Sequence, residues 1–227
     1  MPTDRRSSAA EVSRRDILDA AEACFAERGF AAASMREIAR RAKTSQALLH
    51  HHFGTKANLY DAVKQRFTDQ FNVDRGTSAA AGGGGAPDPA FIVSTVRGYY
   101  QFLQEHPNLS RIGAWARLEG DEQAWGASDE IWARAREWVV GAKRAGLIRA
   151  EIDERLLLVV GGAMVQYWVE HRAFLCRALG LDPDEPGLDE RYLAQALAVL
   201  LQGAGTKALD AVAAFPPPAR RAKRKAS

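Results

Sequence analysis

Cysteine is scarce in this chain, and long apolar segments are absent. The 227 residues include two cysteines, Cys24 and Cys176, and both lie in apolar helical contexts. This favours buried thiols in a reducing compartment over a redox pair. The longest apolar run, Leu156–Val169, includes Gln166 and is too short to cross a bilayer. With a polar N-terminus that lacks a leader's apolar stretch, the sequence predicts a soluble cytoplasmic protein without membrane contact.

The sequence also lacks the motifs of enzymes and metal sites. It has no nucleophile elbow, phosphate-cradling loop, Cys/His metal spacing or paired-carboxylate motif. The consecutive histidines His50, His51 and His52 point about 100° apart on a helix, so they cannot chelate one metal from one face. We therefore expect no catalytic residue, no cofactor and no metal.

Charge divides the chain into a basic head, an acidic body and a basic tail. The net charge is +3 over residues 1–75, −5 over 76–214 and +5 from residue 215 onwards. This asymmetry fits a nucleic-acid-binding head joined to a body that binds something else.

The most specific signal lies in residues 34–56, SMREIARRAKTSQALLHHHFGTK. Ser34, followed three residues later by Glu37, forms a capping box that begins one helix. Thr44 or Ser45 can cap a second helix, which a glycine at residue 54 ends. We expect two short helices joined by a tight turn, followed by the start of a third. A small cationic helical unit of this kind fits a DNA major groove.

This segment resembles the helix-turn-helix of the TetR family of transcriptional regulators. Upstream, RDILDAAEACFAERGF (Arg15–Phe30) resembles that family's first helix and its glycine stop, so the likeness covers about residues 13–70. Two positions depart from the family pattern. Lys43 stands where the family usually has a turn glycine, which costs on the order of 1 kcal/mol if φ is positive there. His50 stands where the family usually has tyrosine.

The resemblance and the helical patterning predict an all-α protein. Its N-terminal three-helix DNA-binding domain contains the helix-turn-helix, and a larger helical bundle binds a ligand and dimerises. The expected segments are a disordered arm (1–12), the helix-turn-helix domain (13–56), a connecting helix (57–76), a flexible Gly/Ala/Pro linker (77–89), the helical effector-binding and dimerisation domain (90–214) and a disordered basic tail (215–227). The helices expected in the body are Pro89–Glu105, Asn108–Glu119, Ser128–Ala145, a long helix from Asp153 to Leu179, and Leu188–Val212.

The partners follow from the resemblance. It implies double-stranded DNA carrying a near-palindromic operator, a small-molecule effector, and a homodimer formed through the last two helices. The residues alone leave the last point open. Leu156–Val169 is apolar on nearly every side, so it is either the central core helix of one subunit or partly an interface with another.

Candidate contacts are assigned by side-chain chemistry and by position near helix starts. Phosphate contacts are expected from Ser34, His52 and Lys56, base contacts from Arg36, Gln46 and His50, and either role from Thr44 and Ser45. Effector contacts are expected from Trp115, Trp132 and Tyr167, for which the alternative is ordinary core packing.

The hypothesis is a sequence-specific DNA-binding transcriptional regulator, a repressor released from its operator by a small-molecule effector. Two alternatives stay open. One is sequence-independent DNA binding through the head and the basic tail Arg220–Lys225. The other is an enzyme with its site in the aromatic-rich body, where Glu119, Glu170 and His171 lie without a recognisable arrangement.

Overall fold

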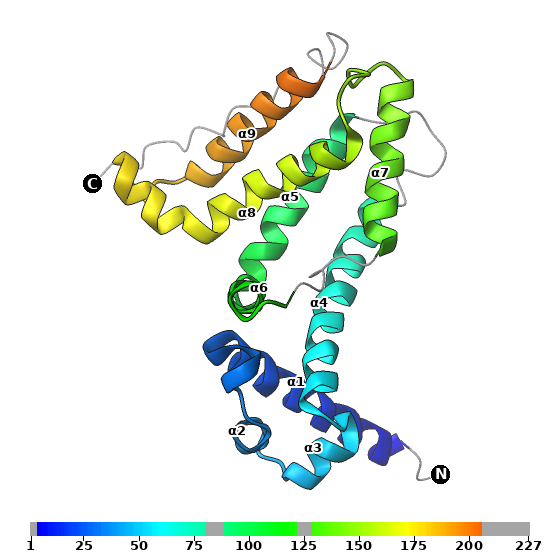
Figure 1. Ribbon diagram of the computed structural model, residues 1–227, viewed down its shortest axis with the longest axis vertical. Helices are drawn as coiled ribbons and strands as arrows, with labels where there is room; N and C mark the ends of the chain where they lie inside the picture. Colours follow the sequence, from blue (N-terminus) through cyan, green and yellow to red (C-terminus); the bar gives the residue numbers. More distant parts are fainter. Residues whose placement is uncertain (1–3, 80–88, 122–128, 206–227) are drawn as a thin grey trace, which may run out of the picture. The chain divides into compact units, whose positions relative to one another are not determined.

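The computed structural model describes residues 4–79, 89–121 and 129–205 (Figure 1). Within these ranges the chain forms α-helices and no strand, apart from an isolated bridge between Ile148 and Gly205. The predicted all-α class is confirmed. The helices are α1 (Asp4–Ala32), α2 (Met35–Arg41), α3 (Gln46–Phe53), α4 (Lys56–Ala79), α5 (Pro89–Glu105), α6 (Pro107–Glu119), α7 (Asp129–Arg144), α8 (Glu154–Leu179) and α9 (Leu188–Ala204). None of these described helices is long and apolar enough to cross a membrane.

The predicted ends of the body helices agree with the structure to within a residue where it is described, except at the end of the last helix. Asp153 caps α8 as expected, because its side chain accepts from the N–H groups of Arg155 and Leu156. Gly180 ends this helix in a left-handed conformation, with φ 66°. Helix α9 ends earlier than the predicted Val212, because Gly205 caps it in an extended conformation with φ −78° and ψ 164°. The predicted linker starts too early at residue 77, because α4 continues to Ala79. Residues 206–212, the basic tail and linker residues 80–88 lie outside the described residues.

The chain divides into two compact units. The first comprises residues 1–74 and 103–129, and the second comprises 75–102 and 130–227. Helix α6 therefore belongs to the N-terminal unit, although the sequence-based boundaries group it with the body. The physical reason is Ile112, which is fully buried in the core of the first unit. Helix α1 begins within the segment predicted as a disordered arm.

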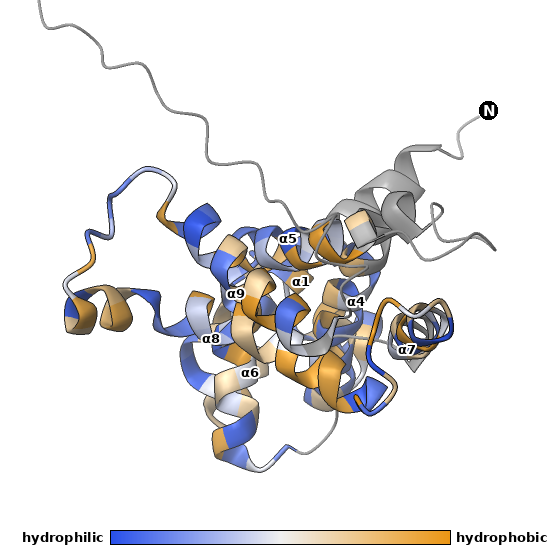
Figure 2. Cartoon of the chain, turned by 90° about the horizontal axis from the view of Figure 1, so that it is seen from above, coloured by the Kyte–Doolittle hydropathy of each residue, from blue (hydrophilic) through white to orange (hydrophobic). Residues whose placement is uncertain are grey.

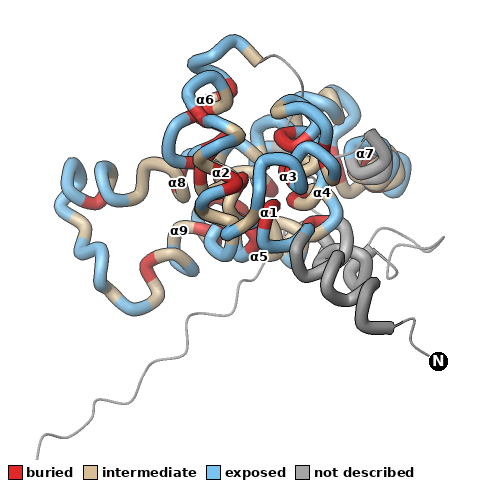
Figure 3. The backbone as a smooth tube through the Cα atoms, turned by 90° about the horizontal axis from the view of Figure 1, so that it is seen from below, coloured by how far each residue is buried: buried red, intermediate tan, exposed pale blue. Residues whose placement is uncertain are grey.

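The first unit is organised around one apolar core. Helix α1 contributes buried residues at helical spacing, α4 packs its own apolar face against them, and α2 and α3 each add anchors. Buried positions are red in Figure 3. The largest fully buried side chains here are Phe25, Phe67, Ile17, Ile38, Leu49, Leu59, Ile112 and Val63. Burial of each such side chain stabilises the unit by about 1.5–3 kcal/mol, so the short α2 and α3 are held by packing.

In the second unit, hydrogen bonds and an ion pair at Asp189 join α8 to α9. Asp189 Oδ1 accepts from Trp168 Nε1 at 2.8 Å and from Arg172 Nε at 2.7 Å. The rings of Trp168 and Tyr192 stack, with centroids 4.2 Å apart. Burial alone would raise the pKa of Asp189, but hydrogen bonds from Arg172, Trp168 and Tyr100 outweigh it and lower that pKa. The carboxylate therefore stays charged and keeps the two helices together.

One face of α8 is apolar and exposed. Leu156, Val159, Val160, Tyr167 and Phe174 are 64%, 58%, 49%, 53% and 57% exposed. Their spacing places them along one side of the helix. Hydrophobic residues, orange in Figure 2, recur along α8. Of the two alternatives left open by the sequence, complete burial within one subunit does not hold in this chain.

Candidate nucleic-acid interface

The connection from α2 to α3 is a tight, capped turn. Ser34 Oγ accepts from the N–H of Glu37 at 3.2 Å, and Ser45 Oγ accepts from the N–H of Leu48 at 3.1 Å. Ser45, rather than Thr44, is thus the cap of α3. Between the caps, Lys43 has φ 53° and is the sole non-glycine residue with positive φ in the described ranges. The sequence-based expectation of a strained lysine at the turn is confirmed.

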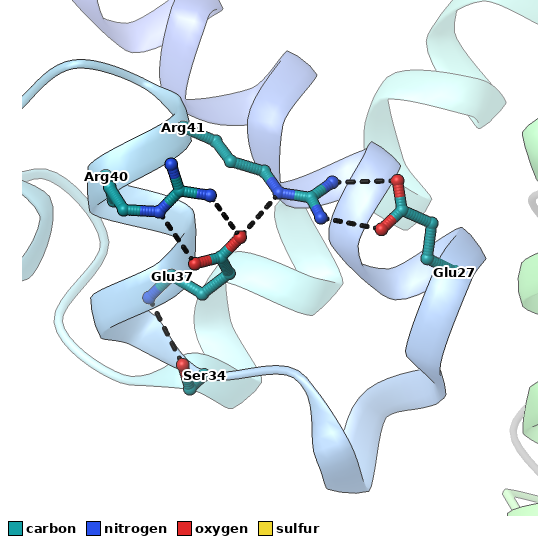
Figure 4. Close-up of polar contacts among 5 residues, drawn as sticks. All are labelled: Glu27, Ser34, Glu37, Arg40 and Arg41. Carbon is teal, nitrogen blue, oxygen red and sulfur yellow. Dashed lines mark hydrogen bonds and ion pairs between the residues drawn. The ribbon is translucent and has the colours of Figure 1, made fainter.

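Acidic side chains on α1 and α2 bind two arginines of α2 (Figure 4). Glu37 accepts from Arg40 Nε at 2.9 Å and Nη2 at 2.7 Å, and from Arg41 Nε at 2.9 Å. Arg41 also donates to both carboxylate oxygens of Glu27, at 2.8 and 2.6 Å. Hydrogen bonds from Arg40 and then Arg41 lower the pKa of Glu37 to about 2. Arg41 therefore braces α2 against α1 through Glu27, while Glu37 holds both arginines of α2 and does not complete the predicted capping box.

This brace changes which cations are available to DNA. The charges of Arg40 and Arg41 are balanced within the head by Glu37 and Glu27. Arg36 is exposed on the same helix, and no ion pair engages it among the described residues. Of the arginines on α2, Arg36 is therefore the one best placed to donate to a phosphate or a base.

Helix α3 is attached by two anchors and leaves the rest of its surface exposed. Leu49 and Phe53 are buried, and the Arg14 guanidinium lies 5.2 Å from the centre of the Phe53 ring. The exposed residues, which we call the recognition face, are Gln46, Ala47, Leu48, His50 and His51. Helix α3 is largely pale blue in Figure 3, which marks this exposure.

The sequence-based choice of contacts on α3 captured part of this face. Gln46 and His50 are exposed and lie on it, whereas His52 is half-buried. Side-chain chemistry alone does not point to Ala47, Leu48 and His51, because it favours long hydrogen-bond donors. The positions of Leu49 and Phe53 indicate which side of α3 is buried. With about 100° of rotation per residue, most of the remaining residues of the helix then fall on the exposed side.

The ring of His50 is fixed by the end of its own helix. Its Nδ1 lies 2.6 Å from the carbonyl oxygen of Gly54, the residue that ends α3. A carbonyl oxygen only accepts hydrogen bonds, so Nδ1 carries the proton. In the neutral ring, Nε2 then has a free lone pair and acts as an acceptor.

Lys56 lies at the start of α4 and holds the segment that follows the kink of α1 at Gly29 and leads into α2. Its Nζ donates to the carbonyl oxygens of Phe30, Ala31 and Ala33 at 2.8, 3.1 and 3.1 Å. It also lies 4.5 Å from the centre of the Phe30 ring. The ammonium has three donors, and these carbonyls match that number. Phosphate binding at Lys56 stays a prediction, which the backbone N–H groups of this helix start favour.

The same segment is held from its other side by α6. Glu119 Oε2 accepts from the N–H of Phe30 at 3.0 Å, and Oε1 accepts from the N–H of Ala31 at 3.1 Å. Gly29 has φ 75°, and a Cβ there would lie 2.3 Å from Glu119 Oε1 and 3.0 Å from the Trp115 ring. Glycine is therefore required at this position, both for its backbone and for the approach of α6.

The three predicted effector residues are divided between the two units. Trp115 packs beside Gly29 in the first unit. Trp132 and Tyr167, in the second unit, are 46% and 53% exposed, and the Tyr167 ring stacks on His171 at 4.3 Å. Their effector role stays a prediction. Over the described residues there is no group of histidine, cysteine and acidic side chains that could hold a metal ion.

Comparison with known proteins identifies the head. Residues 17–63 match the family model of bacterial regulatory proteins of the tetR family. Over 63 residues the chain is 51% identical to the HTH-type transcriptional repressor Rv3405c of Mycobacterium tuberculosis, a match that covers 28% of this chain and 31% of that protein. Over 145 residues it is 30% identical to the A-factor receptor protein of Streptomyces griseus, a match that covers 61% of this chain and 47% of that protein.

The fold likeness extends over most of the chain. The structure of the ketosteroid transcriptional regulator KstR2 of Mycobacterium tuberculosis matches with a TM-score of 0.62 at 19% identity, covering 86% of this chain and 95% of that one. The sequence match to Rv3405c, in contrast, spans about a third of that relative. The N-terminal domain of this chain therefore matches that of the tetR family of bacterial regulatory proteins, and the all-helical fold is similar to that of KstR2.

Proposed function

We propose that this protein is a sequence-specific DNA-binding transcriptional regulator that represses transcription and leaves its operator when a small molecule binds. The observation that carries the proposal is the recognition face of α3, an exposed helix surface set on a capped turn and anchored by Leu49 and Phe53. A surface of this kind enters a major groove. The head of this chain is similar to that of a named repressor, Rv3405c, which supports repression.

The contacts divide into positioning and reading. Gln46, His50 and Arg36 are long enough and exposed enough to reach base edges. Phosphates are held by Ser34, His52 and the helix start at Lys56, while Thr44 and the cap residue Ser45 serve either purpose.

The operator is read by a pair of heads. The exposed apolar face of α8, together with Val199 of α9 at 65% exposure, supports a homodimer formed through these two helices. Two recognition helices on one side of DNA require a spacing of about 34–36 Å or a multiple of a helical turn. The operator is accordingly near-palindromic.

The protein works in the cytoplasm. A small-molecule effector binds its helical body. The likeness to a protein named as the A-factor receptor, over 61% of this chain, supports a receptor role. Release from DNA requires that the effector bind the two states with different affinities, about 1.4 kcal/mol for each tenfold change in operator affinity.

Competition tests the proposal. A labelled promoter fragment bound by the full chain is challenged with unlabelled specific or random DNA at moderate salt. We expect the specific duplex to displace the fragment at a far lower concentration than random DNA. Equal displacement by both would show sequence-independent binding and remove the regulator assignment.

Two substitutions separate the roles of the contacts. Gln46→Ala should change the order of preference among operator variants, whereas His52→Ala should weaken binding to all of them alike. Gln101→Ala, an exposed glutamine on α5, is the matched control and should leave both measurements unchanged. Uniform weakening by both Gln46→Ala and His52→Ala would show that Gln46 does not read bases.

A further inference from the structure

The recognition face of α3 carries an unusual set of side chains. Residues 46–53, QALLHHHF, contain no lysine, arginine, aspartate or glutamate. Arginine and lysine provide the common contact to guanine O6 and N7, and acidic side chains accept from cytosine N4. The helix placed to enter the groove thus lacks the charged residues that select G·C pairs.

Its first residue instead matches adenine. Gln46 is the first helical residue of α3 and is exposed, immediately after the cap Ser45. The glutamine amide pairs with adenine N6 and N7 through one acceptor and one donor.

Its next two residues match thymine. Ala47 is exposed, and Leu48 is 37% exposed although its neighbour Leu49 is fully buried. Apolar side chains on a groove-facing surface contact the C5-methyl group of thymine, which is the one apolar group on the major-groove edge of the bases.

His50 adds a directional constraint. Because Nδ1 donates to the Gly54 carbonyl, the neutral ring offers Nε2 to the groove as an acceptor. An acceptor pairs with the amino group of adenine or cytosine and is repelled by guanine O6 and N7, which are themselves acceptors. Of the two amino groups, adenine N6 agrees with the preference of Gln46.

We infer that the DNA under α3 is rich in A·T pairs, with Gln46 and His50 reading adenine amino groups and Leu48 contacting a thymine methyl. The inference rests on the proposed function and extends it to the class of operator. It concerns the base pairs under α3 only, since Arg36 lies on α2 and reaches flanking positions.

Selection from randomised duplexes with the full-length protein is the first test. We expect one recurrent half-site to emerge, with A·T pairs at the positions under α3. A recurrent half-site with guanine at those positions would overturn the inference while leaving the proposed function intact. If no sequence were enriched over random DNA, the proposed function itself would fail, and the inference with it.

Variants of His50 then test the directional argument. His50→Asn keeps a donor for the Gly54 carbonyl and removes the group at the Nε2 position. His50→Arg places donors there instead and should shift the preferred base at its position from adenine to guanine. Unchanged preference in both variants, with thermal unfolding like that of the wild type, would remove His50 as a reader.

A base analogue tests the same contact of His50 by changing the DNA instead of the protein. Replacing the contacted adenine with a purine that lacks the N6 amino group should weaken wild-type binding about fivefold, the value of one hydrogen bond of about 1 kcal/mol. The same replacement should have little effect on the His50→Asn protein. An equal loss in both proteins would show that His50 does not accept from this amino group.

Discussion

At the residue scale, Lys43 lies in the turn between α2 and α3 with φ 53°. A side chain with a Cβ is strained in this region by about 1–2 kcal/mol, and glycine is not. The positive charge of Lys43 lies beside the proposed DNA surface, where it favours phosphate binding. The lysine therefore exchanges some stability of the turn for charge at the interface.

Replacing this lysine separates the two effects. Lys43→Gly should raise the free energy of unfolding by about 0.5–1 kcal/mol, because the relief of strain exceeds the entropy cost of glycine. Chemical denaturation measures the change. Lys43→Ala is the control, since it removes the charge but keeps the strained backbone, and it should give no gain. A gain from both variants would attribute the effect to charge instead of conformation.

Glu37 makes the stability of the head depend on pH in the acidic range. Its pKa in the folded protein is about 2, below its ordinary value of 4.5, because it accepts from Arg40 and Arg41. A lowered folded pKa stabilises the fold fully above pH 4.5, and this contribution is lost as the pH falls towards 2. Unfolding followed between pH 5 and pH 2 should therefore show a smaller loss of stability in Glu37→Gln than in the wild type. Parallel curves for the two proteins would show that the brace contributes nothing.

At the element scale, the segment that follows the kink of α1 at Gly29 is held through its backbone by two other helices. Glu119 of α6 accepts from the N–H groups of Phe30 and Ala31, and Lys56 of α4 donates to the carbonyls of the same residues. Three elements of the first unit thus meet at one short segment. The orientation of α2, and of α3 after it, depends on these contacts.

Removing the carboxylate should loosen this segment selectively. In Glu119→Ala, amide hydrogen exchange at Phe30 and Ala31 should accelerate about fivefold, which corresponds to about 1 kcal/mol per lost bond. The neighbouring Glu105→Ala on α5 provides a control with no expected change at these amides. If exchange at Phe30 and Ala31 stayed at the wild-type rate, Glu119 would not be holding the segment.

The helices and their ends could be predicted from neighbouring residues, whereas contacts between residues far apart in the sequence could not. The caps Ser34 and Asp153 and the strained Lys43 follow from neighbouring residues alone. The placement of α6 in the first unit rests on the buried Ile112 and on Glu119, which accepts hydrogen bonds from residues 89 and 88 positions away in the sequence. No local pattern encodes that pairing. The same limit explains why the sequence assigned Lys56 to phosphate, since its carbonyl partners are more than twenty residues upstream.

At the scale of the whole molecule, the apolar face of α8 indicates an assembly larger than one chain. Five large apolar side chains of this helix, Leu156, Val159, Val160, Tyr167 and Phe174, are each about half exposed or more. Contiguous apolar surface of this kind on a folded protein marks an interaction site. We propose that a second copy of the chain covers this face, because a two-fold interface uses the same patch on both subunits.

A charge on that face should prevent the pairing. Val159→Glu and Phe174→Glu should each shift the protein from dimer to monomer in sedimentation equilibrium, because pairing would bury an unpaired carboxylate. Operator affinity should fall together with dimerisation, since two heads bind cooperatively. Arg144→Glu on α7 serves as the control for a changed surface charge. Dimers that persist in both α8 variants would place the interface elsewhere.

In the function that we propose, this chain reads a DNA sequence through α3. The most direct measurement is the ratio of dissociation constants for a selected operator duplex and a scrambled duplex of equal composition, at physiological salt. We expect the selected duplex to bind at least about a thousandfold more tightly, as specific DNA-binding proteins do. We also expect Gln46→Ala to lower this ratio of dissociation constants. A ratio near one, with both affinities falling equally as salt rises, would show that α3 does not read sequence.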